Sequence, residues 1–202
     1  MARLELFFDC GSPWTYLAFH AIDALAADAG AQLVRRPILV GGVFNAVNPS
    51  VYEQRANATP VKWKYHAKDL QDWARLYGLA IRWPEVFPVN SVKGMRGCLV
   101  AEEQGRLREY ARALFEAYWG EGLDISKDDV LAKVATRAAL DPLATAARRV
   151  APDIKQRLRD NTDELMARGG FGSPTIFVDG DDMYFGNDRL PLVRAALGLA
   201  PR

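Results

Sequence analysis

Hydrophobic and polar positions give the N-terminal part of the chain the order strand, helix, strand. Residues 4–9, Leu-Glu-Leu-Phe-Phe-Asp, are short, apolar and aromatic, which is typical of a strand. Residues 14–29 space their apolar side chains for one face of a helix, and Gly30 is a typical C-terminal stop. Residues 32–40 are again strand-like, although Pro37 lies inside them. This order predicts a βαβ unit with two parallel strands.

The middle of the chain has no strand-like alternation. Residues 41–59 are expected to be irregular, because glycine, proline and asparagine cluster there. Residues 83–88 pair tryptophan and phenylalanine with prolines, which predicts a rigid aromatic loop. Helical patterning is expected over residues 60–77, 92–119, 127–138, 142–150 and 152–168.

The C-terminal part returns to strand patterning. Residues 169–174, Gly-Gly-Phe-Gly-Ser-Pro, break the helical section. Residues 175–179 and 183–185 are apolar or aromatic and flank a Gly-Asp-Asp turn, which predicts a β-hairpin. Residues 189–197 predict a last short helix.

This order of elements predicts an α/β, thioredoxin-like fold with an inserted all-helical domain. The thioredoxin-like domain is expected to consist of residues 1–42 and 169–202, and the helical insertion of residues 43–168. Pro174 stands at the start of a strand, where this fold carries a cis proline. An unrelated α/β sandwich is the alternative, and a strand within residues 92–167 paired into the main sheet would exclude the predicted fold.

Composition and charge narrow the possible functions. The 202 residues are enough for one large domain, and 26 basic against 25 acidic residues argue against nucleic-acid binding. No apolar run is long enough to cross a membrane, and the acidic Glu5 lies inside the N-terminal apolar stretch, unlike a secretory leader. Cys10 and Cys98 are too few for a disulfide framework or a four-ligand zinc site. We therefore expect a cytoplasmic protein without a metal.

The turn after the first strand carries the first candidate chemistry. Thioredoxin-like folds keep their paired redox thiols in this turn, but residues 12–15 read Ser-Pro-Trp-Thr, so dithiol exchange is not available. Ser12 is suited to cap the helix, with Pro13 at the first helical position. The helix N-terminus also favours an anion, so Ser12 is predicted to donate a hydrogen bond to a thiolate brought by a ligand. Helix capping alone is the alternative for Ser12, and a buried, unreactive thiol is favoured for Cys10.

Two C-terminal motifs complete the candidate site. If Pro174 is cis, the backbone of Ser173 faces the Ser12 turn and is able to pair with an extended peptide; a plain turn is the alternative. In the sequence Gly-Asn-Asp-Arg-Leu at 186–190, Asn187 or Asp188 is able to cap the last helix. The functional alternative is that Asp188 receives an α-amino group.

Several segments together resemble 2-hydroxychromene-2-carboxylate isomerases, close relatives of the kappa-class glutathione transferases in the thioredoxin superfamily. The resemblance rests on Phe-Phe-Asp-x-x-Ser-Pro-Trp-Thr-Tyr-Leu at 7–17, Gly-Ser-Pro-Thr at 172–175 and Gly-Asn-Asp-Arg-Leu at 186–190. It continues through Pro-x-Lys at 60–62 and Trp-Pro-x-x-Phe-Pro-x-Asn at 83–90, and so spans nearly the whole chain.

The resemblance implies glutathione as cofactor and a homodimer. Ser12 would contact the glutathione sulfur, and Ser173, before Pro174, would pair with the cysteinyl part. The matching positions for the two ends of the peptide are Asn187 and Asp188 at the γ-glutamyl end and Lys62 at the glycine end. An asparagine in the loop before Lys62 is also implied; Asn57 is preferred over Asn48. A solvated helix charge is the alternative for Lys62.

The resemblance further implies a small aromatic carboxylate as substrate. Glutathione would add to an unsaturated cyclic hemiketal, the ring would open, rotation would follow, and elimination would return the thiol. The expected reaction converts 2-hydroxychromene-2-carboxylate to trans-o-hydroxybenzylidenepyruvate. Candidate substrate contacts are Trp14, Phe44, Trp83, Phe87 and Asn90, with Arg82, Lys93 and Arg96 as candidate carboxylate binders. For each of these residues the alternative to a substrate contact is a purely structural role, in core packing or as a solvated surface side chain.

Two other functions stay open. A kappa-like glutathione transferase or peroxidase acting on electrophiles would use the same site. A non-catalytic binding module would keep the fold without turnover.

Overall fold

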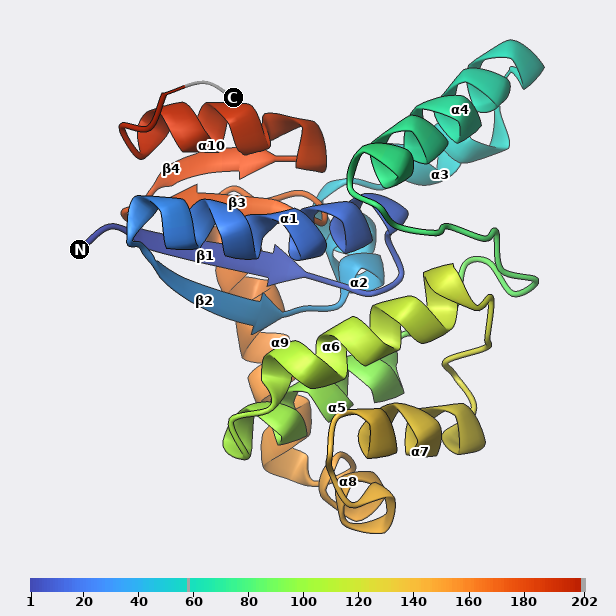
Figure 1. The fold of residues 1–202 in the computed structure, drawn as a ribbon. Helices are drawn as coiled ribbons and strands as arrows, with labels where there is room; N and C mark the ends of the chain where they lie inside the picture. The colour runs from blue at the N-terminus through green and yellow to red at the C-terminus, as the bar shows by residue number, and fades with distance from the viewer. Residues whose placement is uncertain (58, 201–202) are drawn as a thin grey trace.

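A mixed four-stranded sheet organises the protein, in a computed structural model that describes residues 1–57 and 59–200. The strands lie in the order β2-β1-β3-β4 (Figure 1). β1 (Arg3–Phe8) pairs in parallel with β2 (Gln32–Pro37). On its other side, β1 pairs antiparallel with β3 (Thr175–Val178), which forms the hairpin with β4 (Asp182–Phe185). The predicted βαβ unit and the predicted hairpin are therefore confirmed.

Helix α1 (Pro13–Ala29) connects the two parallel strands. Ser12 is its N-cap, and Gly30 ends it with a φ of 57°, in the left-handed region that favours glycine. The helix buries the expected apolar face, including Leu17, Ile22 and Leu25. The turn η2 (Asn187–Arg189) and helix α10 (Leu190–Ala196) pack beside α1 and close the C-terminal unit.

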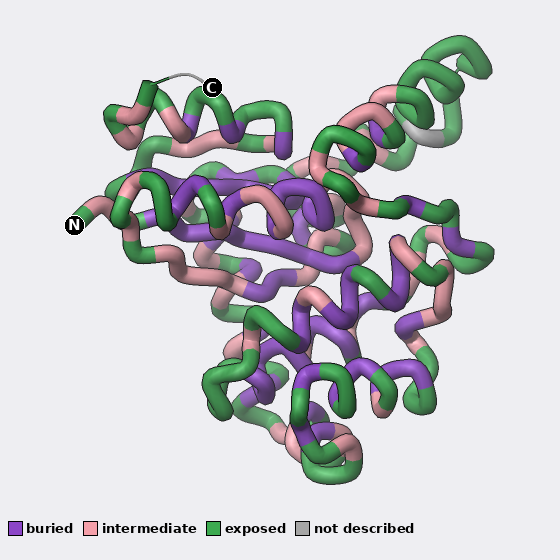
Figure 2. The backbone as a smooth tube through the Cα atoms, viewed as in Figure 1, coloured by how far each residue is buried: buried purple, intermediate pink, exposed green. Residues whose placement is uncertain are grey.

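The two faces of β1 meet different partners because its side chains alternate. Leu4, Leu6 and Phe8 belong to the main core, which α1 and the helical region complete. Phe7 points to the opposite face and packs with Phe177 in a second core. Figure 2 shows the buried backbone running through the sheet and α1 into the helices below them.

Helices fill the region between β2 and β3. Within the described residues, no strand lies between Pro37 and Thr175, so the condition that would have excluded the predicted fold is not met. Figure 1 shows α5 to α8 gathered below the sheet, while α3 and α4 project as an arm. The helices are α2 (Val40–Val47), α3 (Ser50–Ala56), α4 (Pro60–Leu76), α5 (Val92–Glu103), α6 (Leu107–Phe115), the π-helical turn η1 (Glu116–Gly120), α7 (Asp128–Arg137), α8 (Pro142–Arg148) and α9 (Pro152–Ala167).

The expectation of irregular structure over residues 41–59 is wrong. Two short helices, α2 and α3, occupy most of this segment. Val43 of α2 is fully buried against the second core, so tertiary burial outweighs the low helix propensity of Gly41 and Gly42. The strand expected over 32–40 also ends early, at Pro37, because α2 begins at Val40.

The helical structure expected over residues 92–119 is present, but it is divided into α5, α6 and η1. The segment breaks after α5, where Gly105 has a φ of 67° and the chain turns into α6. The antiparallel pair that results buries a tyrosine, Tyr110, between the two helices. A propensity-based reading misses the break because the flanking residues all favour helix.

The division into residues 1–42 with 169–202 and an insertion of 43–168 stays a prediction. Residues 58 and 201–202 lie outside the described part of the chain. Leu165 of α9 and Val43 of α2 both pack on the sheet residues Phe7 and Phe177. Among the described helices, none is both long and apolar enough to cross a bilayer.

The close contact between α5 and α6 gives a stability prediction. A Cβ at Gly97 would lie 2.6 Å from Cζ of the fully buried Tyr110. Gly97→Ala is therefore expected to destabilise the fold by about 1–3 kcal/mol, although alanine favours a helix. Gly41→Ala is the matched control, because nothing lies within 4 Å of its added Cβ. Denaturant unfolding measures both variants, and a Gly97→Ala protein as stable as the wild type would contradict this packing.

Candidate active site

The first turn of α1 faces the peptide bond that precedes β3. The Ser173–Pro174 bond is cis, as the position of Pro174 before a strand indicated. The Ser12 hydroxyl donates to the Ser173 carbonyl oxygen at 3.2 Å and accepts from the Thr15 amide at 3.3 Å. Ser12 is thus a helix cap, and its hydroxyl also spans to the opposite loop. Its position at an N-terminus next to Ser173 agrees with both readings of Ser12.

A buried chain of hydroxyl groups fixes this arrangement from below. The Thr15 and Ser173 hydroxyl oxygens are 2.8 Å apart, and both residues are buried. The Ser173 hydroxyl also accepts from the Asp9 amide at 2.9 Å. These bonds tie the end of β1, the first turn of α1 and the cis-proline loop together.

Two backbone donors at this point remain open. Among the described residues, neither the Trp14 amide nor the Ser173 amide has an acceptor. Buried or partly buried amides without acceptors are costly in a folded protein and are usually satisfied by water or a ligand. A peptide that carries a thiolate would offer acceptors to both, so the residues present fit glutathione.

The carboxyl group of Asp9 lies fully buried at the end of β1. One oxygen accepts from the Gly11 amide at 2.8 Å. The other accepts from the Val40 amide at 2.8 Å and from the Ser91 hydroxyl at 3.0 Å. Burial raises the pKa of Asp9, and these hydrogen bonds oppose that rise in part.

A cavity of about 290 Å³ opens beside the Asp9 partners. Gly11, Val40 and Ser91 all line it, so the hydrogen-bond partners of Asp9 are also walls of the cavity. Of the predicted substrate contacts, Phe44, Phe87 and Asn90 line it as well.

The other two predicted substrate contacts do not line this cavity. Trp14 is half-buried against the main core. Trp83 is 48% exposed and contacts the ring of Phe87 with centroids 4.8 Å apart. Trp83 therefore lies behind one cavity wall and on the molecular surface.

The γ-glutamyl motif lies beside α1, as the packing of η2 on that helix shows. Asn187 is 2% exposed; its side chain lies beside the Tyr77 phenol, and its nitrogen makes no hydrogen bond of normal geometry within the described residues. Asp188 has a half-exposed side chain and pairs with Arg189 at 2.7 Å. Neither side chain caps η2 or α10, so the capping alternative for these residues is wrong.

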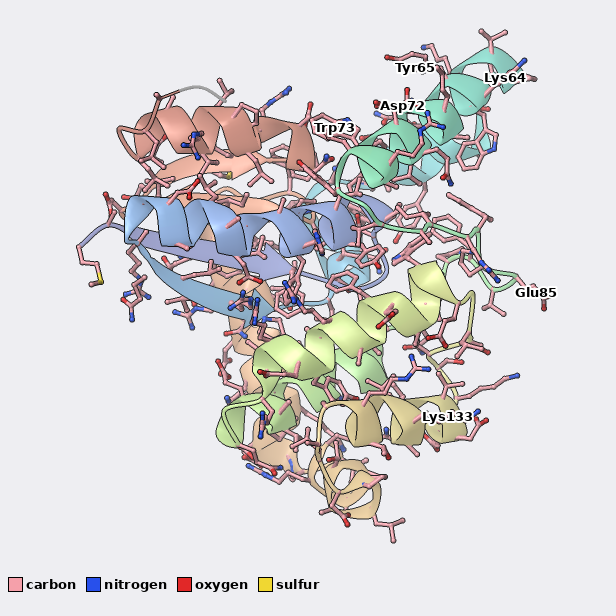
Figure 3. All side chains as sticks on the ribbon, viewed as in Figure 1. Lys64, Tyr65, Asp72, Trp73, Glu85 and Lys133 are labelled. Atoms are coloured by element: carbon pink, nitrogen blue, oxygen red, sulfur yellow. The ribbon has the colours of Figure 1, made fainter. Side chains whose placement is uncertain are left out.

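Asn57 and Lys62 lie on the projecting arm. Asn57 is the exposed C-cap of α3, and Lys62 is exposed in the first turn of α4. Figure 3 places Lys64 and Tyr65, of that same end of α4, at the outer tip, and Trp73 at the inner end near α10. The alternative residue, Asn48, lies near the site, because its side-chain amide donates to the Phe171 carbonyl at 3.2 Å.

The protein's own thiols are inert. Cys10 and Cys98 are both buried, and burial raises the pKa of each thiol well above its usual value. Within residues 1–57 and 59–200, no group of three His, Cys, Asp or Glu side chains is placed to hold a metal ion. Thiolate chemistry at this site therefore requires a thiol from a ligand.

Sequence reasoning missed Asp9, Thr15 and Ser91 as parts of the site. Asp9 carried a usable signal, since an acid directly after an apolar strand is expected to be buried with donors around it. Ser91 carried none, because its bond to Asp9 joins positions that are far apart in the sequence.

Comparisons with known proteins give the same fold and family. Residues 3–198 match the family model of the DSBA-like thioredoxin domain. The chain is 32% identical to 2-hydroxychromene-2-carboxylate isomerase of Pseudomonas putida, over 96% of this chain and 94% of that protein. It is 26% identical to human glutathione S-transferase kappa 1, over 96% and 90% of the two chains. A solved structure of 2-hydroxychromene-2-carboxylate isomerase superposes with a TM-score of 0.82 at 30% identity, covering 97% of this chain and 94% of that one.

The burial of both cysteines predicts how the protein meets thiol reagents. A chromogenic disulfide reagent at neutral pH is expected to leave both thiols unmodified in the folded protein and to modify both after denaturation. A Ser12→Cys variant is the positive control, because its thiol would lie at the half-buried N-terminus of α1 and react without unfolding. Rapid modification of folded wild-type protein would contradict the inert assignment.

Proposed function

Because this chain belongs to the DSBA-like thioredoxin domain family and to the 2-hydroxychromene-2-carboxylate isomerase family, we propose that it is a glutathione-dependent isomerase. Its reaction would convert 2-hydroxychromene-2-carboxylate to trans-o-hydroxybenzylidenepyruvate. The observation that carries the proposal is the Ser12 hydroxyl at the start of α1, facing the cis Ser173–Pro174 bond beside an apolar cavity.

The proposed glutathione site extends from the cavity along the cis-proline loop to η2. The open Ser173 amide is suited to pair with the cysteinyl part, and the buried amide of Asn187 lies in the motif for the γ-glutamyl end. Asn57 and Lys62, on the projecting arm, would reach glutathione only at its glycine end. The proposed contacts are Ser12, Asn57, Lys62, Ser173, Pro174, Asn187 and Asp188.

The Ser12 hydroxyl would exchange partners when the site is filled. It now gives its hydrogen to the Ser173 carbonyl, and turning that hydrogen toward a ligand sulfur would stabilise a thiolate. The Ser173 carbonyl would then accept from a peptide amide, so no acceptor is left unpaired. When bound, glutathione supplies the thiolate that adds to the hemiketal and is eliminated after rotation.

The cavity suits a small aromatic substrate. Phe44 and Phe87 supply aromatic walls, and the Asn90 side chain accepts from the Val92 amide, which leaves its own amide hydrogens for a ligand. Of the candidate carboxylate binders, Lys93 is paired with Asp128 at 2.8 Å. Arg82 and Arg96 form no ion pair among the described residues, but neither of them lines the cavity.

A kappa-class transferase activity is the second candidate, supported by the similarity to human glutathione S-transferase kappa 1. The two activities separate by substrate. Glutathione-dependent ring opening of the chromene supports the isomerase. Conjugation of glutathione to an aryl chloride, with no ring opening of the chromene, supports the transferase. Glutathione binding without either reaction would leave a binding module. The cytoplasm stays part of the proposal, since a pool of reduced glutathione requires a reducing compartment. The homodimer that the family resemblance implies also stays part of the proposal.

Replacing Ser12 tests the thiolate role. Ser12→Ala is expected to keep the fold and to lose about 10–100-fold in rate at saturating glutathione, because a charge-assisted hydrogen bond contributes about 1.5–3 kcal/mol. The loss should be accompanied by a shift of the pH–rate profile to higher pH, because the bound thiol loses a donor that favours its ionised form.

The control for Ser12→Ala removes another N-cap of the same kind. Asp141 caps α8 and is followed by a proline at the first helical position, but it lies in the helical region away from the cavity. Asp141→Ala should lower stability without changing the pH–rate profile. A wild-type rate and profile in Ser12→Ala would falsify the thiolate role and leave Ser12 as a cap.

Asp188 tests the γ-glutamyl end. Its half-exposed carboxylate already pairs with Arg189, so solvent and that pair weaken any contact with an amino group. Asp188→Asn is expected to weaken glutathione binding by about two- to fivefold, or about 0.5–1 kcal/mol. Calorimetric titration measures the change, with Asp182→Asn on β4 as a nearby acidic control. Equal affinities in both variants would remove Asp188 from the site.

A further inference from the structure

Asp9 and Ser91 form a hydrogen-bonded pair that joins the interior to the cavity. The Asp9 side chain is fully buried, whereas Ser91 lines the cavity and is 8% exposed. The Ser91 hydroxyl donates to the Asp9 carboxylate at 3.0 Å. Neither residue is among the proposed glutathione contacts.

The three donors to Asp9 differ in what they are able to do. The Gly11 and Val40 partners are backbone amides, which donate and never accept. The Ser91 hydroxyl both donates and accepts. If Asp9 is protonated on the oxygen that Ser91 contacts, the carboxyl O–H of Asp9 donates a hydrogen bond to the Ser91 oxygen. Its own hydrogen is then released to point into the cavity.

We propose that Asp9 and Ser91 are a proton relay that opens onto the cavity and serves the ring-opening step of the proposed isomerase. This inference rests on the proposed function. Asp9 is the proton store, and Ser91 is the group that touches the substrate.

The relay balances the ring-opening step. The hemiketal C–O bond breaks, its electron pair stays on the phenolic oxygen, and that oxygen takes the proton of the Ser91 hydroxyl. Ser91 takes the proton of the Asp9 carboxyl in the same movement. The hemiketal hydroxyl becomes the ketone and loses its proton, which returns along Ser91 to Asp9. No proton is gained or lost over the step, and no other reactant is needed.

The surroundings of Asp9 suit a group that stores a proton. The titratable groups that face it are the thiols of Cys10 and Cys98 and the phenol of Tyr118. Burial raises the pKa of each of these groups, so none of them carries a charge at neutral pH. Within the part of the chain that the structure describes, no basic side chain is among the groups that shift the pKa of Asp9. Burial therefore raises the pKa of Asp9 with no cation to counter it.

Ser91→Ala tests the relay selectively because the Ser91 side chain makes no capping hydrogen bond to α5. Ser91 occupies the N-cap position of that helix, but its side chain makes no capping hydrogen bond. The substitution thus removes the bond to Asp9 and little else. Ser91→Thr keeps the hydroxyl, and Ser126→Ala removes a serine–aspartate bond of the same kind, to Asp124 at 2.6 Å, away from the cavity.

The relay predicts a loss of kcat with little change in binding. Ser91→Ala should lose about 100-fold in kcat, the usual contribution of general acid–base catalysis, with glutathione affinity and KM within about twofold of the wild type. The pH dependence of kcat should lose the limb that reports Asp9. Ser91→Thr should restore both, and Ser126→Ala should match the wild type. A wild-type kcat and pH profile in Ser91→Ala would overturn the relay.

A second measurement needs neither glutathione nor turnover. Carbon NMR of the Asp9 carboxyl group reports its titration in the protein alone. Ser91→Ala removes a donor to the ionised form, so the Asp9 pKa should rise by about one unit, with no change in Ser126→Ala. If the wild type does not turn over the chromene, the proposed function fails, and an Asp9 pKa that stays unmoved in Ser91→Ala overturns the relay independently.

Discussion

Asp9 joins the turn at the start of α1 to three segments that are distant in the sequence, two through its buried carboxyl group and one through its backbone amide. It ends β1 and accepts from the loop before α1, from the start of α2 and from the serine before α5. Its own amide donates to Ser173 and so fixes the cis-proline loop. Leaving a buried backbone donor without its acceptor costs about 1–3 kcal/mol, so these bonds hold the walls of the cavity in one geometry. The cavity walls and the turn before Ser12 therefore depend on the Asp9 side chain, and the Ser173 loop depends on the backbone amide of the same residue.

The same group sets an electrostatic condition on the site. A negative charge on Asp9 would oppose a thiolate held by Ser12, whereas the N-terminus of α1 and the open amides of Trp14 and Ser173 favour it. Burial raises the pKa of Asp9 and so favours its protonated form. A protonated Asp9 would remove the repulsion and at the same time hold a proton next to the cavity. The two proposed roles, thiolate stabilisation and proton transfer, thus follow from the same protonation state.

Local sequence patterns were enough to place the sheet and the loops that carry Ser12, Ser173 and Asn187, because each loop borders a strand or opens a helix. The segment from Val40 to Ala56 could not be predicted in this way. Its helices depend on burial of Val43 against residues from three other segments, and that contact is invisible in a local pattern.

For a similar reason, the sequence could not decide which asparagine, Asn48 or Asn57, lies nearer the candidate site. Asn57 stands closer to Lys62 along the chain, yet Asn48 is the one that contacts the loop before Ser173. Residue type alone favours capping of the last helix by Asn187 or Asp188. The structure instead uses Asn187 as a buried amide, which only the packing of η2 against α1 determines.

The proposed function requires that this site binds glutathione and holds its sulfur as a thiolate. The most direct test is a pH titration of glutathione on the wild-type protein, with binding followed by calorimetry and the thiolate by its ultraviolet absorbance. We predict saturable binding and a bound thiol whose pKa lies below the value of about 8.5 for a free cysteine thiol. Absence of binding, or a bound thiol with the pKa of the free one, would contradict it.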